Sequence, residues 1–210
     1  MDSLQLKSHP ILPRGRFLRI VALYTQARAP DSLKQSNDMD MPTLSLVIRV
    51  ALVLALLPVL FVGASLAWNY PPLFDTPGMS ARLTTYFTTH VAETRDNHPF
   101  PELRPRTFDV PPDLLFRFSE QTALQSGWLV SSRQPGSHKL TAVATTRVWR
   151  FKDDITLQVH ASPEGGSILY VHSESRLGKG DLGANLRRVI DVTEGITLQV
   201  MEYKKAENQR

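Results

Sequence analysis

Apolar residues follow three patterns along the chain, and each predicts a different kind of element. From Val50 to Trp68 the run VALVLALLPVLFVGASLAW contains no charged residue, so every face of a helix formed by it would be apolar. Between residues 80 and 127 apolar residues recur at helical spacing, and beyond residue 127 apolar and polar residues alternate. The sequence therefore predicts one uniformly apolar helix followed by a domain of the α+β class.

The apolar run is long enough to cross a lipid bilayer. Its nineteen residues span roughly 28 Å as a helix, close to the ~30 Å thickness of the hydrocarbon core. Trp68 lies where interfacial aromatic residues gather, and a kink at Pro58 is tolerated in lipid. We expect a transmembrane helix over residues 44–68, with the lipid bilayer as the partner of Val50–Trp68.

A cleaved signal peptide is the alternative interpretation of this run. The sequence VGA at 62–64 or SLA at 65–67 resembles a cleavage site, and Met39 or Met41 could be the true start. Signal-peptide cores usually hold about 7–15 apolar residues, so the longer run favours an uncleaved anchor. Arg49 precedes the helix and no basic residue follows it before Arg82. This bias predicts a cytoplasmic N-terminus and a domain on the outer side of the membrane.

Proline and glycine divide the remaining chain into three further segments. Residues 1–43 are a basic tail without sustained periodicity, and residues 69–79 are a turn-rich tether in which no helix persists. Residues 80–205 then form the soluble domain, which gives the segments 1–43, 44–68, 69–79 and 80–205.

Two helices are predicted in the first half of the domain. One begins near Ser80, and another begins at Pro111-Pro112 and ends at Gly127. The proline-rich segment Asn97–Pro105 between them is expected to be extended. The residues expected to face the core from the two helical patterns are Leu83, Phe87, Val91, Leu114, Leu115, Phe118 and Leu124.

The second half predicts a four-stranded antiparallel meander that ends in a helix from Leu182 to Lys204, with Asp181 as its N-cap. Asp153 and Asp154 are expected in a turn. A hairpin loop closed by Ala161 and Ser167 would place the apolar residues of both strands on one face. The expected strands are Trp128–Ser132, Leu140–Phe151, Ile155–Ala161 and Ser167–Ser175.

Charge and cysteine content exclude some classes of function. The formal net charge is +4, but the excess of basic residues lies before the apolar run, and the domain is nearly neutral. Nucleic-acid binding requires Lys and Arg gathered on one face, so no nucleic-acid partner is expected. The chain has no cysteine, which excludes disulfides, thiolate metal ligands and a cysteine nucleophile.

The glycine-rich loop before the last helix is the strongest candidate for a binding site. Gly178, Gly180 and Gly183 spell G-x-G-x-x-G, but a dinucleotide site needs a further parallel strand, which the sequence does not provide. An anion could still dock at the helix N-terminus, unless Asp181 occupies it. The candidate anion or partner site comprises Arg150, Arg176, Lys179, Gly180, Asp181 and Asn185.

Other chemistry-bearing residues favour structural roles. His160 and His172 share a strand face but lie roughly 13 Å apart, which is too far to share a metal ion. No serine has a nucleophile-elbow context, and neither a cofactor nor a metal is expected. The outer strand face mixes polar and aromatic groups and is either solvated or a partner surface; its residues are Thr156, Gln158, His160, Ile168, Tyr170, His172 and Glu174.

Four stretches of the domain are distinctive in their residues and their order: Val91–Phe108, Ala123–Trp128, Arg150–Val159 and Ser173–Val189. They resemble a bacterial family known as domain of unknown function 1499, within a likeness that runs from about residue 70 to 200. The resemblance implies a bacterial protein with an N-terminal membrane segment, and it implies no particular activity.

Together these observations favour a non-catalytic binding or structural module on the outer, periplasmic face of a bacterial inner membrane. Its partner would be an envelope protein or a lipid. The alternatives are an envelope enzyme that uses Arg176, Lys179 and Asp181 with Arg150 or Asp153, and a lipid- or anion-binding domain.

Overall fold

A computed structural model describes residues 41–146 and 150–209. The expected basic tail therefore lies outside the described residues, apart from its last three positions. Contacts divide the chain into two units, residues 1–53 and 54–210.

The predicted apolar helix is confirmed as α2, which runs over Met41–Asn69 and so extends beyond both predicted ends. Within it, Thr43–Asn69 has a mean hydropathy of 2.7, and none of its most apolar window is buried. Its length and composition are sufficient to cross a membrane. An apolar helix that is unburied over that window is consistent with a single-pass anchor.

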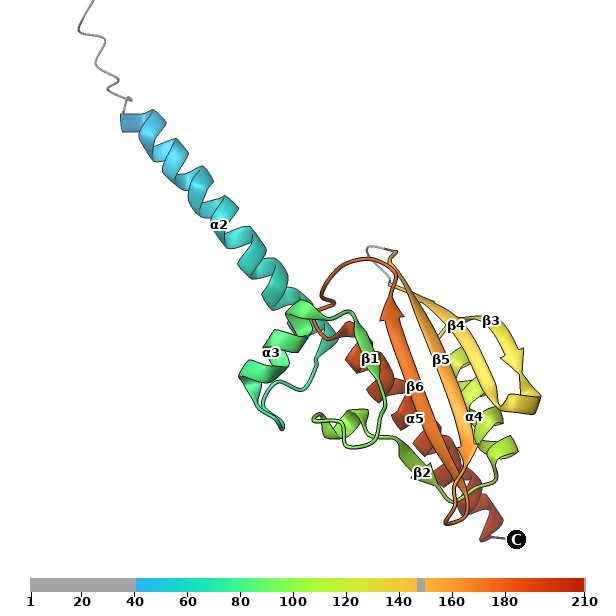
Figure 1. Ribbon diagram of the computed structural model, residues 1–210. Helices are drawn as coiled ribbons and strands as arrows, with labels where there is room; N and C mark the ends of the chain where they lie inside the picture. Colours follow the sequence, from blue (N-terminus) through green and yellow to red (C-terminus); the bar gives the residue numbers. More distant parts are fainter. Residues whose placement is uncertain (1–40, 147–149, 210) are drawn as a thin grey trace, which may run out of the picture. The chain divides into compact units, whose positions relative to one another are not determined.

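An antiparallel sheet of six strands forms the centre of the second unit (Figure 1). Four consecutive strands make the predicted meander, and two further strands pair, one after the other, along the outer edge of its last strand. The strands are β1 (Val91–Glu93), β2 (Arg106–Phe108), β3 (Leu129–Gln134), β4 (Lys139–Thr145), β5 (Lys152–Ala161) and β6 (Ser167–Ser175).

The two longest helices of the domain, α4 (Pro112–Gln125) and α5 (Ala184–Glu207), pack on one face of this sheet, and the core lies between the two layers (Figure 1). The domain also contains the helix α3 (Met79–Thr88), and 3₁₀ turns occur at Pro101–Leu103 and Pro135–Ser137. Leu115 of α4 and Val189 of α5 are fully buried, as is Leu140 of β4. Burial of such side chains is the main stabilising contribution, about 1.5–3 kcal/mol each.

The predicted hairpin register is confirmed at every pair. Ala161 lies opposite Ser167, and Leu157 lies opposite Val171, so the alternating apolar residues of β5 and β6 face the helices together. His160 lies opposite Ile168, on the outer face.

The predicted turn at Asp153 and Asp154 is wrong. β4 ends at Thr145, and both aspartates lie inside β5. Asp153 is buried and its Oδ2 accepts a hydrogen bond from Arg188 of α5. This ion pair stabilises a strand where the local preference of Asp favours a turn.

The predicted core faces of the first two helices are partly wrong. α3 buries Arg82 and Tyr86, while Phe87 is exposed. Leu124 of α4 is exposed as well, whereas Leu115 is buried as expected. The polar groups of Arg82 and Tyr86 find buried partners, which the apolar pattern alone does not reveal.

Candidate functional site

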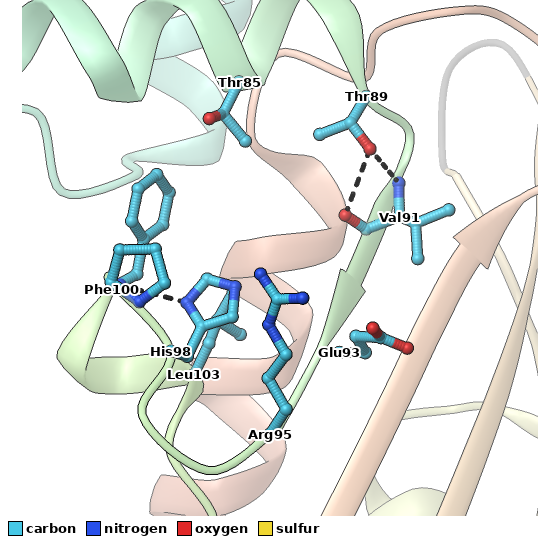
Figure 2. Close-up of a pocket in the computed structure, with 9 residues that line it drawn as sticks. Thr85, Thr89, Val91, Glu93, Arg95, His98, Phe100 and Leu103 are labelled. Atoms are coloured by element: carbon cyan, nitrogen blue, oxygen red, sulfur yellow. Dashed lines mark hydrogen bonds between the residues drawn. The ribbon is translucent and has the colours of Figure 1, made fainter.

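A small pocket lies at the β1 edge of the sheet, between the end of α3 and the segment 95–103 (Figure 2). Its volume is about 280 Å³, near the lower limit of small-molecule sites. Such a volume suits a small ligand or one chemical group of a larger one. The lining residues are Thr85, Thr89, Val91, Glu93, Arg95, His98, Pro99, Phe100 and Leu103.

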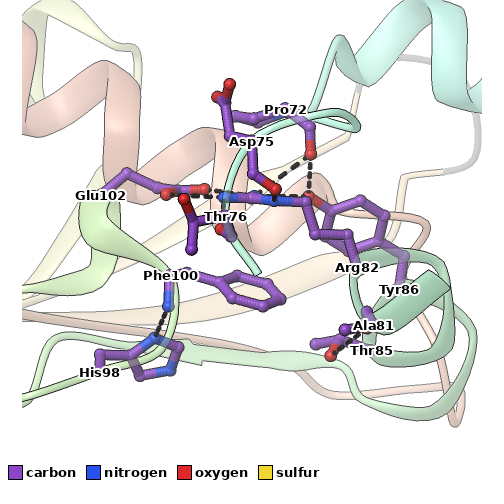
Figure 3. Close-up of polar contacts among 10 residues, drawn as sticks. All are labelled: Pro72, Asp75, Thr76, Ala81, Arg82, Thr85, Tyr86, His98, Phe100 and Glu102. Carbon is purple, nitrogen blue, oxygen red and sulfur yellow. Dashed lines mark hydrogen bonds and ion pairs between the residues drawn. The ribbon is translucent and has the colours of Figure 1, made fainter. Parts of the chain in front are cut away.

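The buried guanidinium of Arg82 holds the walls of this pocket in place (Figure 3). It donates to both carboxylate oxygens of Glu102, at 2.6 and 3.1 Å, and lies 4.4 Å from the centre of the Phe100 ring. Its remaining donors reach the Tyr86 hydroxyl and the carbonyls of Pro72, Asp75 and Thr76. One side chain thus ties the tether, α3 and the segment 95–103 together.

Hydrogen bonding fixes the neutral histidine of the pocket in one tautomer. The backbone N–H of Phe100 donates to Nδ1 of His98 at 3.0 Å. Burial, and after it the charge of Arg95, lower the pKa of His98 below its usual value. The ring is therefore neutral at neutral pH, and its single proton is on Nε2.

The guanidinium of Arg95 extends between His98 and Val91 (Figure 2). Among the residues that the structure describes, its side chain has no hydrogen-bond or ion-pair partner. The free ring nitrogen of His98 is on the side of the ring that faces Arg95. The pocket therefore brings two hydrogen-bond donors together, and a negatively charged group is the chemical complement of such a pair.

Imidazole and carboxylate groups alternate along the outer face beside this pocket. Nδ1 of His172 lies 3.5 Å from Glu93, and Nε2 of His172 lies 3.4 Å from Glu174. Nε2 of His90 lies 3.5 Å from the other oxygen of Glu174. In the described part of the chain no three such side chains converge as metal ligands do. The Glu93 carboxylate, at the rim of the pocket, therefore faces His172.

The glycine-rich loop is filled by its own groups. Both oxygens of Asp181 accept backbone hydrogen bonds, from Gly183 at 2.9 Å and from Asn185 at 2.7 Å. The helix begins at Ala184 with Gly183 as its N-cap residue, two residues later than predicted, yet the Asp181 carboxylate occupies the helix N-terminus as expected. Burial raises the pKa of Asp181.

Backbone packing explains Gly180. A Cβ atom at this position would lie 2.3 Å from the carbonyl oxygen of Phe87. The loop therefore packs directly on the end of α3, and this contact accounts for glycine without a ligand.

The other residues of the predicted anion site are either engaged by other side chains or exposed to solvent. Asn185 is buried and bonds Ser173, Ser175 and the His90 carbonyl. Arg176 makes two hydrogen bonds to Asp154 on the surface, and Arg150 and Lys179 are exposed. The engagement of Asp181, Asn185 and Arg176 favours a structural role for this loop, and the anion site there stays a prediction.

Sequence reasoning missed the pocket. Arg95 and His98 lie in a proline-rich segment without periodicity, and Thr85 and Glu93 belong to elements whose positions depend on β6 and Arg82. The only available signal was the resemblance over Val91–Phe108, which contains most of the lining.

The fold and the pocket define a class: a small α+β domain with a polar pocket at one sheet edge, preceded by a helix able to cross a membrane. The chain belongs to the family described as "Protein of unknown function (DUF1499)", which matches residues 77–195. No curated protein matches the sequence. The chain is also similar to the crystal structure of TTHA0849 from Thermus thermophilus, with 12% identity and a TM-score of 0.31, over 54% of this chain and 98% of the other.

Proposed function

We propose that this protein is a single-pass membrane protein whose domain is a non-catalytic binding module. The observation that carries the proposal is α2: Thr43–Asn69 has 27 residues, a mean hydropathy of 2.7 and an unburied apolar window. Exposing so much apolar surface to water would be strongly unfavourable, whereas lipid solvates it. The lipid bilayer is then the partner of Val50–Trp68.

Two features support binding rather than catalysis. The buried polar side chains around Arg82 and Asn185 bond one another and the backbone, as structural groups do. The pocket, in contrast, offers the donors of Arg95 and His98 to a ligand. We infer an envelope lipid or protein as the binding partner, and no nucleic acid.

Charge bias supports placing the domain on the outer face of a bacterial inner membrane. Arg49 and the basic residues upstream of it precede α2, and the next basic residue is Arg82. Basic residues are retained on the cytoplasmic side, so the domain would be periplasmic.

Alkaline extraction of membranes tests the anchor. The full-length protein should stay in the membrane pellet, whereas the variant L56R/L60R should be released in part. Each Arg near the centre of the helix disfavours insertion by about 2.5–3.5 kcal/mol. The matched control is Leu129→Arg, on an exposed residue of β3. Complete release of the unmodified protein would overturn the proposal.

Cysteine labelling tests the orientation, because the native chain has no cysteine. Glu164→Cys lies in the exposed loop between β5 and β6 and should react with a membrane-impermeant maleimide in intact cells. Ser3→Cys should react only after the cells are opened. The reverse pattern would place the domain in the cytoplasm.

A further inference from the structure

We propose that Arg95 and His98 form a binding site for a phosphate-type oxyanion, held by the guanidinium and by the Nε2–H of the imidazole. The inference rests on the proposed function in one respect, because a domain at a membrane surface meets phosphodiester headgroups at high local concentration. A lipid headgroup and a free phosphate share this chemistry.

Pre-organised donors are the first argument. Because Nδ1 of His98 already accepts the Phe100 N–H at 3.0 Å, the ring cannot turn without breaking that bond. A perpendicular contact with the Phe100 ring, at 5.4 Å between centroids, holds the same orientation. The Nε2–H therefore points into the pocket before any ligand arrives, which reduces the entropy lost on binding.

The unpaired cation is the second argument. Most other arginines around the site have acceptors: Arg82 pairs with Glu102, Arg176 with Asp154, and Arg104 donates to the His98 carbonyl at 3.1 Å. Arg95, which lines the pocket and is exposed to solvent, has none within the described residues. A planar guanidinium can give two parallel hydrogen bonds to a phosphate, which fits an anion better than a neutral ligand.

The acidic groups near the pocket leave room for an anion. Glu93 lines the pocket, but its carboxylate lies 3.5 Å from Nδ1 of His172 on the outer face. Glu102 is held by both terminal nitrogens of Arg82. The groups that influence His98 are thus Arg95, Glu102 and Glu93, and both carboxylates have partners of their own.

Titration of the full-length protein in an uncharged detergent tests the site. The probes are inorganic phosphate and dihexanoyl phosphatidylglycerol, at constant ionic strength set with sodium chloride, with calorimetry as the readout. Arg95→Gln should weaken binding by about tenfold or more, because a charge-assisted bidentate contact is lost. The matched control Arg117→Gln removes the same charge from the exposed face of α4 and should leave affinity unchanged.

A second variant separates the imidazole donor from the fold. His98→Asn retains an acceptor near the Nδ1 position for the Phe100 N–H, but it lacks the Nε2–H. It should weaken binding while leaving the unfolding midpoint close to that of the unmodified protein.

The pH dependence provides an independent readout. A phosphodiester keeps its charge between pH 5 and 8, whereas His98 becomes a cation as the pH falls through its lowered pKa, by protonation of Nδ1 and with loss of the Phe100 hydrogen bond. Affinity for dihexanoyl phosphatidylglycerol should therefore rise as the pH falls from 7. By linkage, the bound lipid should raise the His98 pKa measured from its ring resonances by NMR.

Each outcome bears on the inference. Binding of either probe that depends on Arg95 supports it. A higher affinity for the lipid than for inorganic phosphate indicates a headgroup site, and equal affinities for the two probes indicate a site for free phosphate. No binding of either probe overturns it, as does an equal loss in Arg117→Gln, which would show unspecific attraction. A protein that binds phosphate but is released from membranes would contradict only the anchor.

Discussion

Two neighbouring carboxylates show how strongly one position changes a residue's surroundings. Asp153 faces the helices and is 2% exposed, and its partner Arg188 is 15% exposed. Asp154 faces outward at 53% exposure, and its partner Arg176 is 48% exposed. Both form ion pairs with arginine, yet only the first pair has lost most of its water.

The two aspartates should therefore respond differently to substitution. Asp153→Ala leaves Arg188 without its carboxylate in a buried position, and we expect the free energy of unfolding to fall by about 3–5 kcal/mol. Asp154→Ala removes a solvated pair and should lower it by less than about 1 kcal/mol. Urea unfolding of the full-length protein in detergent measures both. Similar losses would show that burial does not distinguish the two pairs.

Arg82 should not be replaceable by lysine. Lysine keeps the charge, but it cannot bond both oxygens of Glu102 and three carbonyls at once. Arg82→Lys should lower the free energy of unfolding by about 2 kcal/mol or more, because buried acceptors lose their donors. Arg117→Lys, on an exposed position, is the control. Equal unfolding midpoints for the two variants would show that Arg82 is dispensable for the fold.

At the residue scale the sequence draws attention to the wrong arginines. Arg176 stands beside a glycine motif, although in the structure it makes a surface pair with Asp154. Arg82 stands in no motif, and Arg95 lies in a stretch that only the family resemblance singles out. Their importance depends on Glu102, Phe100 and His98, which reach them only after the segment 95–103 has folded back.

At the scale of elements, the glycine-rich loop and α3 act as one packed unit. The Leu182 N–H donates to the Tyr86 carbonyl at 3.0 Å, and Gly180 lies against the Phe87 carbonyl. The loop therefore transmits any disturbance of its backbone to the helix that borders the pocket.

Alanine substitution at two glycines tests this packing. Gly180→Ala forces a Cβ to within 2.3 Å of backbone, and we expect a loss of about 1–3 kcal/mol in the free energy of unfolding. Gly136→Ala, where nothing lies within 4 Å of the added atom, should change it little or increase it slightly. Thermal unfolding of both variants provides the measurement. An unchanged midpoint in Gly180→Ala would mean that the loop does not rest on α3.

Patterns that repeat could be predicted at this scale, and elements fixed by distant partners could not. The β5–β6 register follows from two alternating runs and a five-residue loop, and it is confirmed. β1 and β2 have three residues each, too few for a visible alternation, and exist because β6 provides their hydrogen bonds. The predicted start of β5 is wrong because the buried partner of Asp153 lies on α5.

At the scale of the whole molecule, hydrogen exchange should reveal the central strands as the most stable part. β5 and β6 each have partners on both sides, whereas β3 lies at one edge and its pairing with β4 is irregular at Val130/Ser132. Amides of Leu157 and Leu169 should exchange only through global unfolding, and those of β3 through local opening at lower free energy. Equal protection of β3 and β5 would contradict this order.

The apolar helix and the pocket are unequally visible in the sequence of the whole chain. The apolar helix is visible because membrane insertion depends on composition over about twenty contiguous residues. The pocket depends on α3, β1 and the segment 95–103 meeting at one sheet edge. No contiguous stretch of the sequence records such a meeting.

The shared edge of β6 has a consequence during synthesis. Val91 pairs with Glu174, so β1 leaves the ribosome roughly 80 residues before its partner, a delay of about 4–16 s at ordinary elongation rates. Throughout this interval the future wall of the pocket has no strand to join. Because β1 has only three residues and prolines follow it, its pairing with neighbouring nascent chains is limited. The pocket is therefore among the last features of the protein to mature.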